Sequence, residues 1–276
     1  MPHRVPRYFD WLIAERIVGD PARDVHLGYW VTPPSADALP ARGEFESAQG
    51  MLTRRIVSMA RPVDGDRILD VGCGFGGGLA FLNARLREAN LVGVNIDRRQ
   101  LQVCSEIQPI SGNQIGLIEA DACALPFNRD VFDLVVCIEA IFHFRSRFTF
   151  LQEAARVLRP GGRLVLTDFT FVEDASTAPW SIETMTNALQ DDYGPWPDVW
   201  FAPGSLTETA ARAGFAILEA HDWTGNTLPS YRTTAPLVSP LPSPSPDAAE
   251  VLRWLHNSGR LRYEARVLLL SEAYRR

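Results

Sequence analysis

The 276-residue sequence predicts an α/β protein in which a mostly parallel, seven-stranded sheet carries helices on both faces. Three observations lead to this fold class. Between residues 67 and 170, short apolar runs alternate with amphipathic segments. One apolar run ends in the glycine-rich turn 72–78, after which a helical segment begins. Hydrophobic residues make up 46% of the chain and charged residues 22%, which is typical of a globular protein with a large core.

The core of the predicted fold spans 63–170 and contains five strands, each a short apolar run of the kind buried on both faces of a sheet. These strands are Arg67–Val71, Leu91–Asn95, Ile115–Glu119, Phe132–Ile138 and Arg163–Asp168. Helices are predicted over Gly77–Ala89, Arg98–Gln108 and Phe148–Leu158. The last helix should end at Arg159-Pro160-Gly161-Gly162, because proline and glycines stop a helix and turn the chain.

Three further segments flank this core. A helical arm, 1–62, should contain helices near 8–18 and 45–60. An insert, 171–204, is rich in Trp and Pro and poor in periodicity. The remainder, 205–276, should complete the sheet with an antiparallel last pair of strands. Its proline-rich stretch 237–246 is predicted to be a surface loop. The elements expected there are a helix over Ser205–Ala213, a strand over Phe215–Asp222, a helix over Ala248–His256 and a strand over Tyr263–Leu270.

Composition excludes several kinds of chemistry. All 27 basic residues are arginines, so the chain has no lysine that could form a Schiff base or bind phosphate in a nucleotide-binding loop. The net charge of −6 argues against nucleic-acid binding. The scattered cysteines Cys73, Cys104, Cys123 and Cys137 predict reduced thiols, no metal site and a cytoplasmic protein. No apolar run is long enough for a membrane span.

The glycine-rich turn is ambiguous when it is taken alone. Gly72, Gly74 and Gly77 satisfy the dinucleotide-binding pattern GxGxxG. Two features favour another ligand: Asp70 ends the strand where it could meet a cationic or amino group, and Gly76 adds a further close glycine.

Five segments in order then match one family: LDVGCGFGG, GVNIDRRQL, EADACALPF, FDLVVCIEAIFH and RVLRPGGRLVLTDF. The chain resembles the class I S-adenosylmethionine-dependent methyltransferases. It is most similar to the small-molecule branch that includes sterol, tocopherol, sugar and polyketide O-methyltransferases. The marks of that branch are His26-Leu27-Gly28-Tyr29-Trp30 in the arm and Asn95 after the second strand. The resemblance implies a Rossmann-like fold and S-adenosylmethionine as the cofactor.

The resemblance also implies a set of cofactor contacts. Asp70, Gly72 and Gly74 would face the methionine part, and Ile138 would line the methyl-bearing end together with Glu139. Asn95 stands where the family usually has the acidic residue that holds the ribose. Asp97 is the alternative ribose partner, with Gln100 in support.

Further contacts involve the adenine ring and the arm. Asp121 would accept the adenine amino proton, and the backbone of Ala122 would meet the ring. Gln49 and Tyr29 resemble arm residues that close over the cofactor carboxylate. The alternatives are that Asp121 caps a helix, Tyr29 is a packing aromatic and Gln49 belongs to a polar helix face.

On the acceptor side, His143 is the candidate general base, and Asp168 at the end of the next strand would orient it. The alternative gives both residues structural roles at helix ends, and His26 and His221 are weaker candidates. The insert holds five large aromatics, which we interpret as a lid over an apolar acceptor or, alternatively, as a plug on the sheet. They are Trp180, Tyr193, Trp196, Trp200 and Phe201.

The sequence therefore predicts an enzyme that methylates a hydroxyl group of a small, apolar or polyketide-like specialised metabolite. One alternative is C- or N-methylation by positioning alone, and another is a protein that binds the cofactor without methyl transfer. The expected partner is the small-molecule acceptor, with neither nucleic acid nor membrane, and a homodimer is left open.

Overall fold

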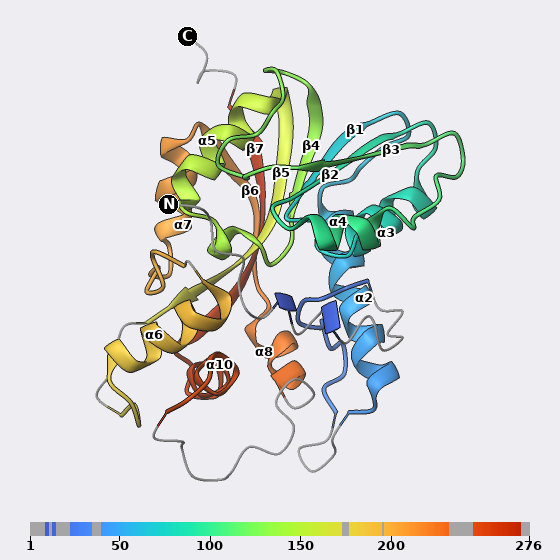
Figure 1. Cartoon of the computed structure of the whole chain (residues 1–276). Helices are drawn as coiled ribbons and strands as arrows, with labels where there is room; N and C mark the ends of the chain where they lie inside the picture. Colours follow the sequence, from blue (N-terminus) through green and yellow to red (C-terminus); the bar gives the residue numbers. More distant parts are fainter. Residues whose placement is uncertain are drawn as a thin grey trace.

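A computed structural model describes residues 9–10, 13–14, 23–34, 40–172, 177–194, 196–231 and 245–271 of the chain. At its centre lies a seven-stranded sheet with the strand order β3-β2-β1-β4-β5-β7-β6 (Figure 1). The strands are β1 (Arg67–Val71), β2 (Asn90–Asn95), β3 (Gln114–Glu119), β4 (Phe132–Cys137), β5 (Leu158–Phe171), β6 (Phe215–Asp222) and β7 (Leu261–Leu270). All neighbours are parallel except β7, which runs antiparallel to β5 and β6. The predicted fold class and its antiparallel last pair are confirmed.

The middle of the sheet determines where a ligand can bind. β1 and β4 are neighbours there, with Asp70 opposite Val136. Every residue of β4 is buried, and so is every residue of β1 after Arg67. The strand order reverses between these two strands, and open α/β sheets bind ligands at the carboxyl ends of strands at such a point.

Helices cover both faces of the sheet. They are α2 (Arg42–Met59), α3 (Gly77–Arg85), α4 (Arg98–Cys104), α5 (Arg147–Val157), α6 (Ile182–Tyr193), α7 (Ser205–Arg212), α8 (Thr224–Thr227) and α10 (Ala248–Asn257), with short 3₁₀ turns η1 (Ile141–His143) and η2 (Leu228–Ser230). Apolar side chains of α2, α3 and α4 join Ile68 in one core cluster, whereas those of α5 and α7 join Leu69 in another. Successive residues of β1 thus point to opposite faces, as a strand requires.

The structure corrects the interpretation of the insert. Residues 182–193 form α6, although we expected this segment to lack periodicity. Ile182, Met185 and Leu189 do recur at helical spacing, and Ser181 caps the helix by accepting a hydrogen bond from Thr184 N–H. The surrounding Trp and Pro residues obscured this short pattern. α6 lies beside α10 in Figure 1, and Asp192 on α6 accepts a hydrogen bond from Ala248 N–H at 3.0 Å.

Some boundaries also differ from those predicted. α3 ends at Arg85 and α4 at Cys104, in both cases before the predicted ends. β5 begins at Leu158 and continues to Phe171, and the predicted turn 159–162 lies inside it as an irregularity in the pairing with β4. The arm helix expected near 8–18 and the proline-rich loop 237–246 lie mostly outside the described residues.

Candidate functional site

The glycine loop after β1 forms a tight cradle at the carboxyl edge of the sheet. Gly72 and Gly74 have φ values of +74° and +55°, which favour glycine. A Cβ atom on Gly72 would overlap Ala140, so the loop lies directly against the segment that follows β4. Both the backbone conformation and the packing against Ala140 therefore require glycine at position 72.

Asp70 lies beneath this loop and is almost completely buried. Its Oδ2 lies 2.7 Å from the position that a Cβ on Gly78 would take, at the start of α3. Burial and the negative charge of Asp24 together raise the pKa of Asp70 to about 7, against the lowering influence of His26. Few positive charges offset the negative charge of this buried carboxylate, so it is suited to bind a cationic group of a ligand.

The arm supplies a charged pair beside Asp70. His26 Nδ1 donates to the Leu27 carbonyl at 2.7 Å, and Nε2 lies 2.9 Å from Thr53 Oγ1 and 3.3 Å from Asp24 Oδ1. Because the Thr53 hydroxyl donates to Asp24, Nε2 must carry a proton as well. Burial lowers the pKa of His26, but its hydrogen bond and charge interaction with Asp24 raise it to about 9. His26 is therefore an imidazolium at neutral pH.

Gln49 and Tyr29, both predicted to close over the cofactor, hold the arm in place. Gln49 Nε2 donates to the carbonyls of Asp24 and His26 at 3.0 and 2.7 Å. The Tyr29 ring packs edge-on against Trp223, with centroids 5.2 Å apart. These contacts agree with the packing role that the sequence left open for Tyr29, and they give Gln49 a role in shaping the arm.

The predicted ribose residues gather at the end of β2. Asn95 Nδ2 donates to Gln100 Oε1 at 3.2 Å, and Asn95 Oδ1 accepts from Asp97 N–H. The Asp97 carboxylate caps α4 and pairs with Arg99 at 2.8 Å. Gln100 Nε2 is buried and has no hydrogen-bond partner among the described residues, so it is a donor that a ligand hydroxyl could satisfy. The residues present thus fit a ribose-bearing cofactor.

Asp121 and Ala122 follow β3, where the adenine was expected. Asp121 Oδ1 accepts a hydrogen bond from Cys123 N–H at 2.7 Å, and its Oδ2 lies 3.4 Å from Arg145 Nε. Ala122 is buried. The first contact closes a turn. No helix begins at Asp121 in the described segment between β3 and β4, so the alternative of a helix cap is wrong.

Glu139, directly after the half-buried Ile138, is tied to three elements. Its backbone N–H donates to Thr167 Oγ1 on β5, and its φ is +45°. Oε1 accepts hydrogen bonds from Leu27 N–H at 2.9 Å and from the Tyr263 hydroxyl at 2.7 Å. Burial raises the pKa of Glu139, against the lowering influence of His26 and these donors. A strained backbone held this firmly is typical of a functional position.

His143 ends η1 on the acceptor side of the predicted site. Its Nδ1 donates to the Tyr193 carbonyl at 2.7 Å, so the lone pair of a neutral imidazole is on Nε2. The ring packs against Phe142 and Trp196, with centroids 4.3 and 6.5 Å away. Burial lowers the pKa of His143 to about 4, so the ring is neutral at physiological pH.

Asp168 does not have the partner that we predicted. Its carboxylate accepts hydrogen bonds from Arg147 Nε and Nη2, and it does not bond to His143 within the described residues. Arg147, a buried guanidinium on α5, also pairs with Asp198 of the insert at 2.6 Å. Sequence reasoning missed Arg147, although a single arginine on the apolar face of a helix was a usable signal. The backbone carbonyl of Tyr193 orients His143 instead.

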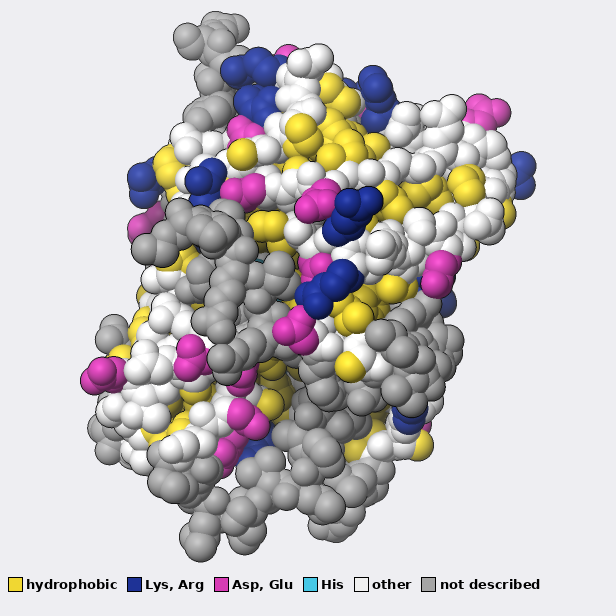
Figure 2. Space-filling model, viewed as in Figure 1, with side chains coloured by type: hydrophobic (Ala, Val, Ile, Leu, Met, Phe, Trp, Pro, Cys, Tyr) yellow, Lys and Arg dark blue, Asp and Glu magenta, His cyan; other side chains and the backbone are white. Residues whose placement is uncertain are grey.

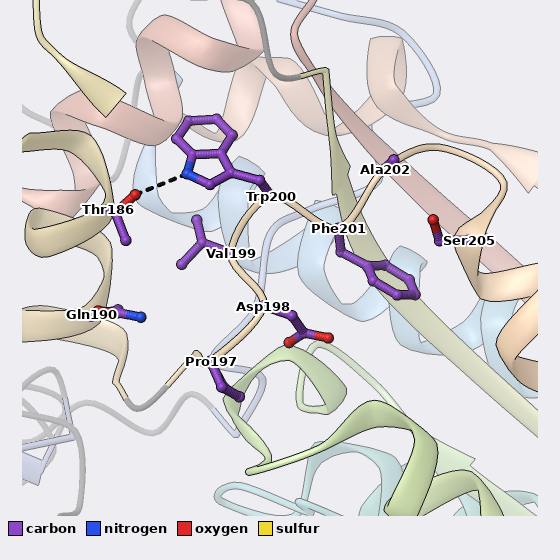
Figure 3. Close-up of a pocket in the computed structure, with 9 residues that line it drawn as sticks. All are labelled: Thr186, Gln190, Pro197, Asp198, Val199, Trp200, Phe201, Ala202 and Ser205. Carbon is purple, nitrogen blue, oxygen red and sulfur yellow. Dashed lines mark hydrogen bonds between the residues drawn. The ribbon is translucent and has the colours of Figure 1, made fainter. Parts of the chain in front are cut away.

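The insert both seals the sheet and forms a surface pocket. Trp196 is fully buried among Phe142, Phe169 and Phe171, as a plug would be. Trp200 and Phe201 instead line an open pocket of about 390 Å³ between α6 and the start of α7 (Figure 3). There the Trp200 indole donates to Thr186 Oγ1 at 2.8 Å. Trp196 therefore packs as a plug would, whereas Trp200 and Phe201 line a surface pocket.

Charges of both signs are mixed on the described part of one face of the molecule (Figure 2). On the face in Figure 2, arginine and acidic side chains are interspersed over the described residues. The longest described helix, α2, is too polar for a lipid bilayer, and none of the other described helices could cross one either.

Sequence comparison identifies what this chain is similar to. A family model described as a methyltransferase domain matches residues 69–166. The methyltransferase GfsG of Streptomyces halstedii is 37% identical over 160 residues, which cover 56% of this chain and 55% of that protein. O-methyltransferase rstn1 of Aspergillus nomiae is 34% identical over 72% of this chain and 83% of its own length. O-methyltransferase cnsE of Penicillium expansum is 31% identical over 75% of this chain and 71% of its own.

Solved structures share the fold at low sequence identity. The geranyl diphosphate C-methyltransferase of Streptomyces coelicolor A3(2) superposes with a TM-score of 0.73 at 15% identity, covering 98% of both chains. The [4+2]-cyclase SpnF superposes with a TM-score of 0.70 at 20% identity, covering 96% of this chain and 93% of SpnF.

Proposed function

The chain belongs to the class I S-adenosylmethionine-dependent methyltransferases, and we propose that it methylates a hydroxyl group of a small, largely apolar molecule. The observation that carries this proposal is the orientation of His143, whose Nδ1 is fixed by the Tyr193 carbonyl so that Nε2 can accept a proton. Relatives named O-methyltransferases support oxygen as the accepting atom.

The cofactor supplies an electrophilic methyl group on a sulfonium sulfur. Asp70, the backbone of Gly72 and Gly74, and Gln100 would hold it at the carboxyl ends of β1 and β2. His143 would accept the hydroxyl proton through Nε2 while the acceptor oxygen takes the methyl group. Phe142, Tyr193 and Trp196 would exclude water and align the acceptor, and alignment can be worth an effective molarity of roughly 10⁵–10⁸ M.

The direct test is methyl transfer to a panel of hydroxylated aromatic and polyketide-like acceptors. Mass spectrometry should detect the gain of one methyl group, and NMR of the product should place it on oxygen. His143→Ala should abolish most of this product. His221→Ala, at a half-exposed histidine, is the matched control and should not. A product methylated on carbon or nitrogen, or no product from any acceptor, would contradict the proposal.

A second candidate is C- or N-methylation by positioning alone. It is favoured by the absence of a carboxylate partner for His143 within the described residues, since Asp168 is bound to Arg147. Tyr193 and Trp196 beside His143 could then stabilise a cationic intermediate on the acceptor. In that case the product would carry the methyl group on carbon or nitrogen, and His143→Ala would keep most of the activity.

A further inference from the structure

Three carboxylates gather where the arm closes on the glycine loop. Asp24 presses against Gly77, Asp70 lies against Gly78, and Glu139 precedes Ala140, which touches Gly72. The three come from the arm, from β1 and from the end of β4, and therefore from separate parts of the sequence. All of them surround the loop that would hold the cofactor.

Among the described residues, one cation acts on all three of these carboxylates. His26 is the cation whose charge acts on Asp24, Asp70 and Glu139 alike. Its Nε2 already interacts with Asp24 Oδ1 and Thr53 Oγ1. Three carboxylates therefore share one imidazolium, so a cationic ligand group that binds there would meet a carboxylate that has no cation of its own.

Glu139 has a free oxygen for such a ligand. Leu27 N–H and the Tyr263 hydroxyl both donate to Oε1, and none of the described residues donates to Oε2. These two bonds and the Thr167 contact fix the side chain at the end of β4, beside the strand that carries Asp70. The carboxylate is therefore preorganised with one oxygen unused.

We propose that Glu139 recognises the positive charge of the cofactor's sulfonium, while Asp70 binds its α-ammonium group. The sulfonium and the α-ammonium group of S-adenosylmethionine would thus each meet one carboxylate of the cluster. S-adenosylhomocysteine, the product left after transfer, keeps the ammonium group but has an uncharged thioether. Glu139 therefore favours the methyl donor over the spent product. This inference rests on the proposed cofactor and not on the nature of the acceptor.

Calorimetry without any acceptor tests the inference. Glu139→Gln keeps the shape of the side chain and removes its charge. It should weaken binding of S-adenosylmethionine on the order of tenfold, as expected for one partly screened charge at close range. Binding of S-adenosylhomocysteine should change less than about twofold. Sinefungin, which carries an amine in place of the sulfonium, should follow S-adenosylmethionine.

Two further variants separate charge from structural support. Glu219→Gln removes one charge from β6 and should change neither affinity. Tyr263→Phe removes one donor to Oε1 but keeps the carboxylate, so the preference for S-adenosylmethionine should stay or increase. This second variant carries the test alone if Glu139→Gln does not fold, and a reduced preference would then overturn the proposal.

The remaining outcomes are equally distinct. Equal losses for both ligands in Glu139→Gln would mean that Glu139 only anchors the arm, and no loss for either would mean that it does not face the sulfonium. Either result overturns the inference. Failure of every acceptor to be methylated would contradict the proposed O-methylation and leave these binding results unaffected.

Discussion

Arg147 donates hydrogen bonds to both carboxylate oxygens of Asp168, at 2.8 and 2.9 Å, in a position that solvent does not reach. This pair connects α5 to the end of β5, and Asp198 extends it to the insert. Such bidentate geometry between a guanidinium and a carboxylate is specific in distance and in direction. Asp168 therefore holds three elements together below the acceptor side of the site.

The first prediction is that Asp168→Asn is primarily a stability defect. Removing one member of a buried ion pair leaves the other charge without compensation and costs about 3–5 kcal/mol. Urea unfolding should show this loss. Asp198→Asn is the control: its side chain is 41% exposed, so the same change should cost less than about 1 kcal/mol. If Asp168→Asn unfolded like the wild type but lost turnover, the interpretation of Asp168 as the partner of His143 would be restored.

The second prediction concerns Asp70, whose pKa burial raises to about 7. Affinity for S-adenosylmethionine should fall as the pH is lowered from 7 to 5.5, because protonated Asp70 cannot balance the ammonium group. Asp70→Asn should bind weakly and without this pH dependence, as calorimetry would show.

Lowering the pH should increase the free energy of unfolding, in contrast to its effect on the affinity for S-adenosylmethionine. The folded chain binds the Asp70 proton more tightly than the unfolded chain, so its contribution to the free energy of unfolding falls as the pH rises from about 4 to 7. Asp70→Asn should therefore have a higher Tm than the wild type at pH 8. A lower Tm together with normal cofactor binding would contradict the site assignment.

The sequence was sufficient for the core because its signals there are local. The apolar run of β1 and the glycines that follow it predicted both the strand and the loop, and β6 has the predicted bounds. The mostly parallel sheet and its antiparallel last pair were also predicted, because strands joined by helices favour parallel pairing. α6 was missed because it buries only Met185 and Leu189, too few residues for a clear period.

The pairing of polar side chains could not be predicted in the same way. Asp168, Arg147 and Asp198 are separated in sequence, and which carboxylate a guanidinium selects depends on packing between α5, β5 and the insert. The same holds for Glu139, whose partners Leu27 and Tyr263 come from opposite ends of the chain. The adjacency of strands four and five led us to expect Asp168 near His143, but it could not predict that the carboxylate bonds to Arg147 instead.

The third prediction concerns the arm. Asp24 raises the pKa of buried His26 to about 9, so the stabilisation from this pair is complete below about pH 6.5 and is lost as the pH rises through 9. His26→Gln should therefore lower the free energy of unfolding at pH 6 and 7, and its difference from the wild type should shrink by pH 10. Urea unfolding at these pH values measures the effect, with His221→Gln as the control. A difference that does not vary with pH would show that His26 is not charged.

The last prediction separates base catalysis by His143 from positioning alone. Burial lowers its pKa to about 4, so the folded chain holds this proton less tightly than the unfolded chain. Two consequences follow from the neutral ring. Turnover of a hydroxyl acceptor should rise with pH through about 4 and be flat from pH 6 to 8, in contrast to a solvent-exposed histidine, which titrates near 6.5. Stability should likewise increase between pH 4 and 6.5, and His143→Ala should remove that increase.

At pH 7.5, His143→Ala should also lower turnover by roughly 10²–10⁴-fold. The affinity for S-adenosylmethionine should stay unchanged, because the ring faces the acceptor. Turnover of His143→Ala within about threefold of the wild type would assign the rate to alignment between the aromatic rings, and the reaction would then be methylation of carbon or nitrogen.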